Sequence, residues 1–463
     1  MKRRGTRFGK RGSTRAKAPD SLAAESASAH LLRIEKPIYG GAFLARVAGK
    51  AVFVPLALPG EQVQARIVDD KRGYATAETE EILDPSRQRV VPLCPHFGAC
   101  GGCQYQHAQY AAQLAYKKDI LRETLERGGV YPPEDIAVLA AEPWAYRNRI
   151  RLAFDANGNA GYRGRRSHAV IPIAECAIAA PLLVRAALAA NEILRKSPAK
   201  LHASEISLFC DANETELLIG VALAGVVKAQ IEDFAQTLAG EIPALKGVEF
   251  VAESGKGQAP RTVAQWGSNS LIYRATGFDY RVDQGAFFQV NRWLVDSLAE
   301  RVTAHACGAL AWDLFSGVGL FARKLSRSFK RVVAVESAPQ SIAALEHNLQ
   351  GSNATAVKAA TLEFLRRERE RNQPDLIVPD LIVPDLIIVD PPRTGLGPET
   401  TALLGEIAAP EIVYVSCDPA TLARDLRALC DSRHGAGYVI DQITLADLFP
   451  QTFHLETIVH LRR

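Results

Sequence analysis

The stretch that decides the fold is Asp313-Leu314-Phe315-Ser316-Gly317-Val318-Gly319-Leu320-Phe321-Ala322. It is typical of a strand that passes through a tight glycine turn into a helix. The glycines, among them Gly317, let the backbone approach a cofactor closely. Glu336 ends the next expected strand, where its carboxylate can accept hydrogen bonds from two ribose hydroxyls. These features predict an adenosine-containing cofactor, either S-adenosylmethionine or NAD, because the glycine spacing also fits a dinucleotide fingerprint.

Outward from this stretch, strand-like segments alternate with helical patterns over residues 287–463, beginning with a helical pattern at Asn291–Ala306. This alternation predicts an α/β domain with a parallel, doubly wound, Rossmann-like sheet whose ligand lies at the carboxyl ends of the strands. The expected strands are Leu310–Phe315, Arg331–Glu336, Ala354–Lys358, Leu386–Asp390 and Ile412–Ser416, with a closing pair at Tyr438–Leu445 and Leu455–Leu461.

The rest of the chain divides into three further regions. Residues 1–30 form a basic tail that we expect to be disordered. Residues 31–90 contain short strands between turns, among them Ala42–Val47, Ala51–Val54 and Val63–Val68, which predicts a small β-barrel of a kind that often presents a face to nucleic acid. Residues 91–286 predict a mixed α/β central domain, whose arginines flank Tyr146 and Tyr162. That composition suits contacts with RNA phosphates and bases, or structural ion pairs.

Composition narrows the class of protein. The chain has 463 residues, of which 48% are hydrophobic, so it can bury several globular cores. No apolar run reaches the roughly 18 residues of a membrane span, and the N-terminus has no apolar signal segment. We therefore expect a cytoplasmic protein with no membrane association and no obligate protein partner. The basic tail suits a polyanion such as RNA, or serves only to keep the protein in solution.

The cysteines are unevenly spaced. Cys94, Cys100 and Cys103 fall within one short segment, whereas the other five are scattered. Disulfides are not expected in a chain without a secretion signal, so the cluster predicts metal or iron–sulfur ligation. Zinc and an iron–sulfur cluster fit the spacing equally well.

Two later motifs carry the chemistry. Asp390-Pro391-Pro392-Arg393 follows the fourth expected strand, where the prolines hold the chain extended near the cofactor. Cys417-Asp418-Pro419 ends the fifth strand and begins a helix, with Asp418 as the N-cap. A thiol at a helix N-terminus is expected to have a lowered pKa and to act as a nucleophile. The simpler interpretation is that Cys417 only packs against the sheet.

Glu456 lies at the start of the last expected strand and ends the motif Phe449-Pro450-Gln451-Thr452-Phe453-His454-Leu455-Glu456. The chain can return there towards the strand ends that carry Cys417. A nucleophile, a base and a methyl donor are what alkylation of pyrimidine carbon 5 requires. The nucleophile must add to carbon 6 first, and a base must later remove the carbon-5 proton.

These motifs, together with Phe287-Phe288-Gln289-Val290-Asn291, resemble in order those of the RNA 5-methyluridine methyltransferase family. The resemblance covers residues 31–463 and implies S-adenosylmethionine as cofactor and a uridine in RNA as substrate. It implies that Cys417 is the nucleophile and Glu456 the base. It also implies that the cofactor is contacted by Gln289, Phe315, Gly317, Glu336 and Asp390.

The resemblance extends to the N-terminal half. Residues 31–90 resemble a TRAM domain, an RNA-binding barrel, and the cysteine cluster resembles the 4Fe-4S site of the branch that acts on ribosomal RNA. This implies four thiolate ligands, Cys94, Cys100, Cys103 and Cys176, and 23S rRNA as the RNA partner. Because methyl transfer needs no electrons, we expect the cluster to have a structural or RNA-shaping role.

Some positions depart from the family pattern. Leu320 stands where many members have Asn, Asp418 where Asn is common, and residues 358–361 offer no clear contact to adenine. A repeat at residues 374–388 places a proline every five residues, which is incompatible with one continuous buried strand. We expect only its last copy to enter the sheet, through Leu386–Asp390, and the earlier copies to form a surface loop or flap.

Three other functions remain open from the sequence. A transfer-RNA enzyme would act on the same base atom. An oxidoreductase using NAD and an iron–sulfur centre would explain the glycine turn and the cluster, but would give Cys417 and Glu456 no role. A non-catalytic RNA-binding assembly factor would be expected to have lost the nucleophile or the base, and both are present.

Overall fold

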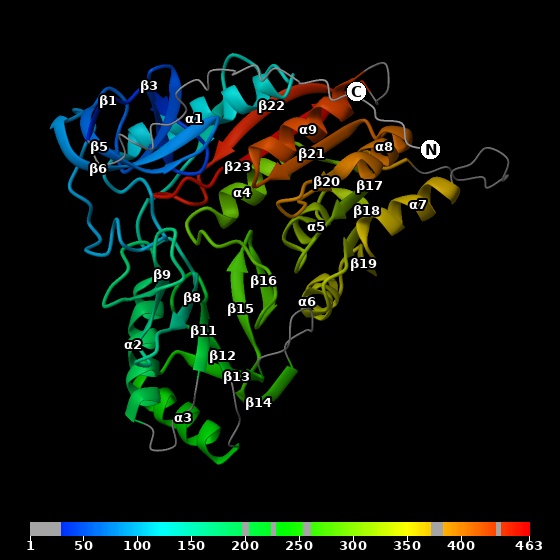
Figure 1. The fold of residues 1–463 in the computed structure, drawn as a ribbon. Coiled ribbons are helices and arrows are strands. Elements are labelled where there is room, and N and C mark those ends of the chain that lie inside the picture. Colours follow the sequence, from blue (N-terminus) through cyan, green and yellow to red (C-terminus); the bar gives the residue numbers. More distant parts are fainter. Residues whose placement is uncertain (1–28, 197–202, 224–227, 253–260, 372–382, 432–436) are drawn as a thin grey trace, which may run out of the picture. The chain divides into compact units, whose positions relative to one another are not determined.

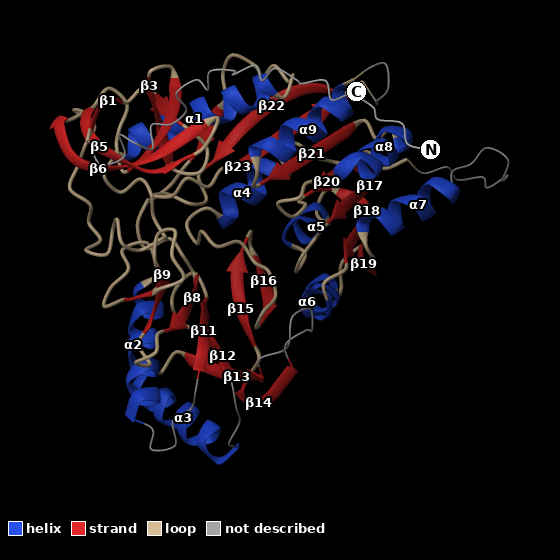
Figure 2. Ribbon diagram, in the orientation of Figure 1, coloured by secondary structure: helices blue, strands red, loops and turns tan. Residues whose placement is uncertain are grey.

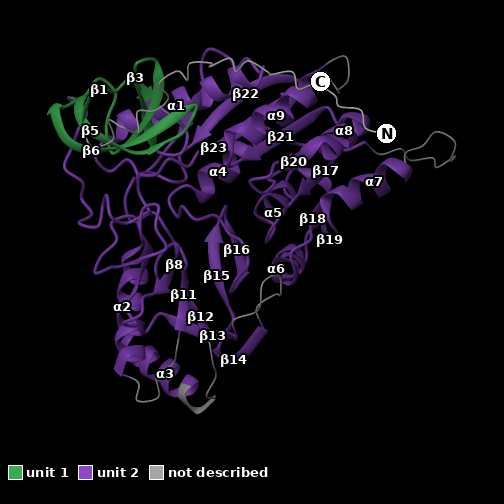
Figure 3. Ribbon diagram, viewed as in Figure 1, with its two compact units in different colours: residues 1–36, 42–86 green, residues 37–41, 87–463 purple. Residues whose placement is uncertain are grey.

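The computed structural model describes residues 29–196, 203–223, 228–252, 261–371, 383–431 and 437–463. The chain divides into two compact units, residues 1–36 with 42–86 and residues 37–41 with 87–463 (Figure 3). The predicted basic tail lies outside the described residues, apart from its last two positions. Among the described helices, none combines the length and apolar character that a membrane crossing requires.

The first unit is built around a six-stranded sheet with the order β1-β5-β6-β4-β3-β2. Alternating side chains such as Phe43 and Val52 are fully buried in its core. The strands predicted at 42–47, 51–54 and 63–68 are confirmed, and the long strand β6 was not expected. The strands are β1 (His30–Arg33), β2 (Lys36–Pro37), β3 (Ala42–Val47), β4 (Lys50–Pro55), β5 (Gln62–Asp70) and β6 (Tyr74–Asp84).

The second unit contains an eight-stranded sheet with the order β19-β18-β17-β20-β21-β23-β22-β7 (Figure 1). β17 to β21 are parallel, and β23 lies antiparallel between β21 and β22. The predicted doubly wound sheet and its closing pair are confirmed. The strands are β7 (Ala137–Leu139), β17 (Gly308–Leu314), β18 (Phe329–Glu336), β19 (Ala354–Lys358), β20 (Leu386–Val389), β21 (Glu411–Ser416), β22 (Val439–Ala446) and β23 (Glu456–Arg462).

Helices cover both faces of this sheet (Figure 2), because its buried strands are apolar on both sides. In β17, Leu310 and Trp312 belong to one core and Ala311 to the other. One face is covered by α4 (Val295–Val302), α5 (Leu320–Leu325) and α6 (Pro339–Leu349), and the other by α1 (Tyr110–Arg127), α7 (Thr361–Arg371), α8 (Gly397–Ile407) and α9 (Pro419–Cys430). The helix expected at 291–306 is shorter than predicted, since α4 is confined to its middle.

Two elements of this sheet domain come from a part of the chain that we expected to be central. β7 pairs in parallel with β22 and forms the edge of the eight-stranded sheet. α1 packs on α9, and a Cβ atom added at Gly128, the C-cap of α1, would lie 2.6 Å from Ala423 Cβ. The sheet domain therefore needs residues 110–139 in addition to the C-terminal segment.

The remaining central residues form a separate seven-stranded sheet with the order β10-β9-β8-β11-β12-β13-β14, which shares one core with α2 and α3. A two-stranded sheet, β15 (Ser270–Ala275) with β16 (Phe278–Asp283), packs on α6 of the sheet domain. The larger sheet and its helices are β8 (Arg149–Phe154), β9 (Ala160–Arg163), β10 (Val170–Pro172), α2 (Pro181–Lys196), β11 (Ala203–Cys210), β12 (Leu217–Leu223), α3 (Lys228–Glu241), β13 (Leu245–Ala252) and β14 (Arg261–Gly267).

The last copy of the proline repeat enters the sheet. It forms β20, which lies between β17 and β21 as predicted. Asp385, just before it, accepts hydrogen bonds from the backbone N–H groups of Ala309 and Leu310 through Oδ2, at 2.6 and 3.0 Å. This carboxylate fixes the register of β20 against the start of β17. The expected loop or flap formed by the earlier copies falls on residues 374–382, outside the described residues.

Candidate active site

A cavity of about 640 Å³ opens at the carboxyl ends of β17, β18, β20 and β21. β17 is the first strand of the parallel set and lies between β18 and β20, so the strand order reverses there, which is where doubly wound sheets bind ligands. All the catalytic and cofactor-binding residues predicted from the sequence line this cavity: Gln289, Phe315, Gly317, Glu336, Asp390, Cys417 and Glu456.

The glycine turn after β17 has the backbone geometry expected of a cofactor loop. Phe315, Gly317 and Gly319 all have positive φ angles, of 63°, 57° and 91°. Gly319 is the N-cap of α5, and a Cβ atom there would lie 2.8 Å from Leu345 Cδ1, so both conformation and space require glycine. This close packing of α5 on α6 keeps the turn open to the cavity.

Two carboxylates hold the turn in place. Glu336 Oε2 accepts a hydrogen bond from Gly317 N at 2.8 Å, and its Oε1 accepts from the backbone N–H groups of Ser337 and Ala338 at 2.6 Å. Asp313 is fully buried beneath the turn, and its Oδ2 accepts from Ala322 N at 2.8 Å. Burial, followed by the nearby Asp390 and Glu336, raises the pKa of Asp313 to about 8.

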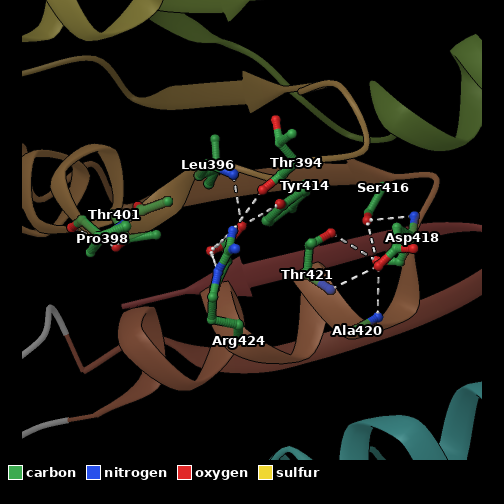
Figure 4. Close-up of polar contacts among 12 residues, drawn as sticks. Thr394, Leu396, Pro398, Thr401, Tyr414, Ser416, Asp418, Ala420, Thr421 and Arg424 are labelled. Atoms are coloured by element: carbon green, nitrogen blue, oxygen red, sulfur yellow. Dashed lines mark hydrogen bonds and ion pairs between the residues drawn. The ribbon is translucent and has the colours of Figure 1, made fainter.

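Helix α9 begins as the sequence predicted. Asp418 Oδ1 accepts hydrogen bonds from the backbone N–H groups of Ala420 and Thr421, at 3.0 and 2.9 Å (Figure 4). Pro419 occupies the first helical turn, where its missing N–H costs nothing. The other carboxylate oxygen of Asp418 accepts a hydrogen bond from the Tyr39 hydroxyl at 3.2 Å. Cys417 is thus fixed between a sheet strand and a capped helix.

The Cys417 thiol is not acidified in the free protein, contrary to our prediction. Burial, followed by the neighbouring carboxyl groups of Glu456 and Asp390, raises its pKa to about 12, although Arg393 opposes the shift. The helix dipole is worth about 1 kcal/mol or less, so it is outweighed by burial and by the two acids. Cys417 is therefore a neutral thiol until another positive charge enters the cavity.

Glu456, which is buried, and Asp390, which is partly buried, form an interacting pair of acids. Burial raises the pKa of Asp390 to about 7. Burial, and then the proximity of Asp390, raises the pKa of Glu456 well above its ordinary value, and Arg393 opposes this only in part. A raised pKa makes a carboxylate a stronger base, which suits a residue that must remove a proton during catalysis.

The segment that carries Glu456 rests on a buried polar framework that sequence reasoning missed. Lys117 Nζ lies 2.6 Å from Asp447 Oδ1, and both side chains are fully buried. The same Nζ donates to Phe449 O at 3.0 Å, and Asp447 Oδ2 accepts from the Tyr110 hydroxyl at 2.8 Å. The Tyr146 hydroxyl donates to Pro450 O at 3.0 Å. Tyr146 is fully buried, so of the two roles left open for this region, contact with RNA or a structural one, it has the structural one.

A second set of contacts joins this segment to the chain after the cysteine cluster. Gln451 O accepts from the backbone N–H groups of Gln104 and Tyr105, both at 3.0 Å. Gln451 also exchanges hydrogen bonds with the Gln113 side chain, at 2.9 and 3.0 Å. No local sequence pattern indicates these pairs, because their members are more than three hundred residues apart.

The four predicted ligand cysteines meet at one pocket of about 80 Å³, lined by Cys94, Cys100, Cys103 and Cys176. Burial raises the pKa of Cys103 to about 12, and Cys176 and Cys100 add to the shift. Within the described ranges, no three His, Cys, Asp or Glu side chains are arranged to hold a single metal ion. A four-iron cluster has a different requirement, since each thiolate binds a different iron atom. The cysteines themselves are free, without disulfides.

The sheet and its cavity together define the class of protein. Three features indicate a Rossmann-like methyltransferase. They are the glycine turn after the first parallel strand, the carboxylate at the end of the second, and the antiparallel strand beside the last. The chain belongs to the tRNA (uracil-5-)-methyltransferase family, which matches residues 109–463. Residues 31–79 match the TRAM domain. These matches confirm the resemblances to the methyltransferase family and to the TRAM domain.

Relatives agree over almost the whole chain. An uncharacterized RNA methyltransferase of Streptomyces avermitilis is 34% identical, covering 91% of this chain and 95% of its own. The 23S rRNA (uracil(1939)-C(5))-methyltransferase RlmD of Klebsiella pneumoniae is 32% identical, covering 91% and 93%. The structure of Pyrococcus abyssi tRNA (uracil-54, C5)-methyltransferase with S-adenosyl-L-homocysteine has a TM-score of 0.73 at 24% identity, covering 93% and 99%. It shows the same fold.

Proposed function

We propose that this protein transfers a methyl group from S-adenosylmethionine to carbon 5 of a uridine in RNA. The observation that carries the proposal is the convergence of the Cys417 thiol and the Glu456 carboxyl on the cavity that also contains the glycine turn and Glu336. Family membership supports it. An oxidoreductase would leave Cys417 and Glu456 without a role, and an assembly factor would not need them.

Cys417 and Glu456 divide the reaction between them. Once the thiol proton has left to solvent, Cys417 Sγ forms a bond to uracil C6 as the thiolate, and the electrons of the C5–C6 double bond move towards C5 and O4. S-adenosylmethionine supplies the electrophilic methyl group that C5 takes up, and S-adenosylhomocysteine is the leaving group. Glu456 then removes the proton on C5, and that electron pair restores the double bond and expels Cys417 as thiolate. Gln289, Phe315, Gly317, Glu336 and Asp390 would bind and orient the methyl donor.

The raised pKa values predict that the charge of the methyl donor activates the thiol. Cys417 should be alkylated by iodoacetamide faster with S-adenosylmethionine bound than with S-adenosylhomocysteine, whose sulfur is neutral. Lowering the pKa of the thiol by one unit gives about tenfold more thiolate. Because a less basic thiolate is also a weaker nucleophile, the expected gain in alkylation rate is about threefold. Peptide mass spectrometry measures the rate, with Cys430 as internal reference. Equal rates with both ligands would contradict this activation.

Covalent trapping tests the proposed reaction itself. RNA that contains 5-fluorouridine has no removable proton on C5, so incubation with the protein and S-adenosylmethionine should accumulate an adduct that survives denaturing electrophoresis. The Cys417→Ala variant should form none, because the bond to C6 cannot form. Cys430→Ala, which removes a half-buried thiol at the other end of α9, is the matched control and should react normally. An adduct with Cys417→Ala would refute the assigned nucleophile.

We propose 23S rRNA as the substrate. Relatives from Halomonas elongata and Klebsiella pneumoniae that bear this function in their names are 31% and 32% identical. A transfer RNA is the alternative, because the family name and the Pyrococcus abyssi enzyme refer to one. Mapping 5-methyluridine in both RNAs from cells lacking the protein distinguishes them. We propose that the protein modifies rRNA in the cytoplasm. Loss of 5-methyluridine from transfer RNA alone would overturn this assignment.

We further propose that the four cysteines hold a 4Fe-4S cluster. Their thiols share one pocket, and Gly102 N donates to Cys100 Sγ at 3.3 Å, which favours a thiolate at that position. A zinc ion bound by the same four cysteines is the alternative. Because Gln104, next to Cys103, bonds the segment that leads to Glu456, the cluster would support the active site rather than supply electrons.

Metal content tests the cluster. Protein purified without oxygen should be brown and contain about four iron atoms per chain, and Cys103→Ser should lose both the colour and the iron. Cys210→Ser, which removes a buried thiol elsewhere, is the control and should keep them. A colourless protein with one equivalent of zinc would refute the cluster.

A further inference from the structure

His454 is a cavity-lining group that the proposed reaction has not yet used. It lies two residues before Glu456, and both line the same cavity as Cys417. Its ring contacts the rings of Phe453 and Phe449, with centroids 4.3 and 5.5 Å away. These two aromatic contacts fix the plane of the imidazole, so its ring nitrogens have set directions.

The hydrogen bond to Arg393 fixes the protonation state of this ring. Arg393 Nη2 lies 3.2 Å from His454 Nδ1. A guanidinium can only donate, so Nδ1 must present its lone pair and the single ring proton must reside on Nε2. Burial, followed by the positive charges of Arg393, Arg147 and Lys117, lowers the pKa of His454 to about 4. The acids on the cavity wall, Asp390 and Glu456, do not reverse this shift.

We propose that His454 donates a hydrogen bond from Nε2–H to O4 of the target uracil, and so both stabilises the intermediate and selects uracil. The proposal rests on the proposed function. When Cys417 adds to C6, charge moves through C5 onto O4. This oxygen is attached to C4, the ring neighbour of C5, and C5 carries the proton that Glu456 must remove. A donor on the same short segment as that base is placed to serve this oxygen. Fixed donors aimed at a developing oxyanion are among the larger contributions to catalysis.

The same donor discriminates between pyrimidines. Cytosine carries an amino group where uracil has O4. That amino group is itself a donor, so two donors would face each other and remain unpaired in a buried site. A site built to hydrogen-bond one exocyclic group rejects the analogue that lacks it. Neutral His454 therefore favours uracil over cytosine without any contribution from the RNA sequence.

A substrate–enzyme double-mutant cycle tests the contact. Two synthetic RNAs that span the mapped site are compared, one with uridine and one with 4-thiouridine at the target, because sulfur is a weak acceptor. Each is methylated by the wild-type protein and by His454→Phe, which keeps an aromatic ring against Phe449 and Phe453. We expect His454→Phe to lower kcat on uridine by about a hundredfold. Replacing O4 by sulfur should lower the kcat of both proteins, and the decrease should be about tenfold larger for the wild-type protein than for the variant.

Equal sulfur effects in the two proteins would overturn the inference. If the wild-type protein fails to methylate unmodified RNA, the proposed function itself has failed, which is a different result. Nitrogen-15 NMR of histidine-labelled protein adds a readout that does not depend on activity, with His454→Phe used to assign the signal. At pH 7 we expect the neutral Nε2–H tautomer. An Nδ1–H tautomer or an imidazolium would also overturn the inference.

Discussion

Glu456→Gln should leave the protein covalently attached to ordinary uridine-containing RNA. Cys417 can still add to C6, and C5 can still take the methyl group, but glutamine cannot remove the C5 proton. Loss of a general base slows the dependent step by about 10²–10⁴-fold. The methylated adduct should therefore accumulate when wild-type protein shows none, and denaturing electrophoresis with radiolabelled methyl groups measures it.

The matched control is Glu411→Gln, at the opposite end of β21 from Cys417, where the carboxylate only pairs with Arg462 at 3.3 Å. It should turn over normally. Release by the wild-type protein should accelerate with rising pH to a higher pH than an ordinary glutamate would give, because burial raises the pKa of Glu456 and its basic form is populated only above that pKa. Rapid release by Glu456→Gln would assign the base to another residue.

Lys117→Met should destabilise the second unit strongly. The substitution leaves the buried Asp447 carboxylate with the Tyr110 hydroxyl as its remaining side-chain partner, and removes the donor to Phe449 O. Removing one member of a buried pair costs about 3–5 kcal/mol, since an uncompensated charge stays in the interior. The free energy of unfolding in urea measures the effect, and methyl transfer should fall at temperatures where the variant is still folded, because the pair supports the Glu456 segment.

Lys118→Met is the control. The Lys118 side chain is partly exposed, and its ion pair with the exposed Asp135 is a loose contact of 3.8 Å. It should change stability by no more than about 0.5 kcal/mol. Adding Asp447→Leu to Lys117→Met should recover part of the loss, since the buried charge is then removed. An unfolding midpoint of Lys117→Met equal to that of the wild type would show that the pair contributes nothing.

The parallel sheet could be predicted from the sequence because its signals are local. Each strand is a short apolar run, and Gly317 and Gly319 indicate a turn that few other residues permit. In a sheet of this kind, the carboxyl ends of β17, β18, β20 and β21 share one edge. That is why the sequence alone places Glu336, Asp390 and Cys417 together.

Features that depend on distant partners could not be predicted in this way. Nothing around Lys117 indicates that its ammonium meets Asp447, 330 residues later. The pKa of Cys417 was predicted in the wrong direction, because the helix is visible in the sequence whereas the desolvation and the approach of Glu456 are not. The long strand β6 was also missed, because Glu78, Glu80 and Glu81 interrupt its apolar pattern and acidic residues are uncommon in strands.

The parallel pairing of β7 with β22 bears on how the chain folds as the ribosome makes it. Residues 137–139 emerge long before their partners at 444–446 exist. Closing so large a loop is slow and leaves apolar surface uncovered in the meantime. The seven-stranded sheet between them can fold first as a unit, whereas α1 and β7 must wait for the last thirty or so residues. Chains stalled near residue 430 should therefore be protease-sensitive at 110–139 and depend on chaperones.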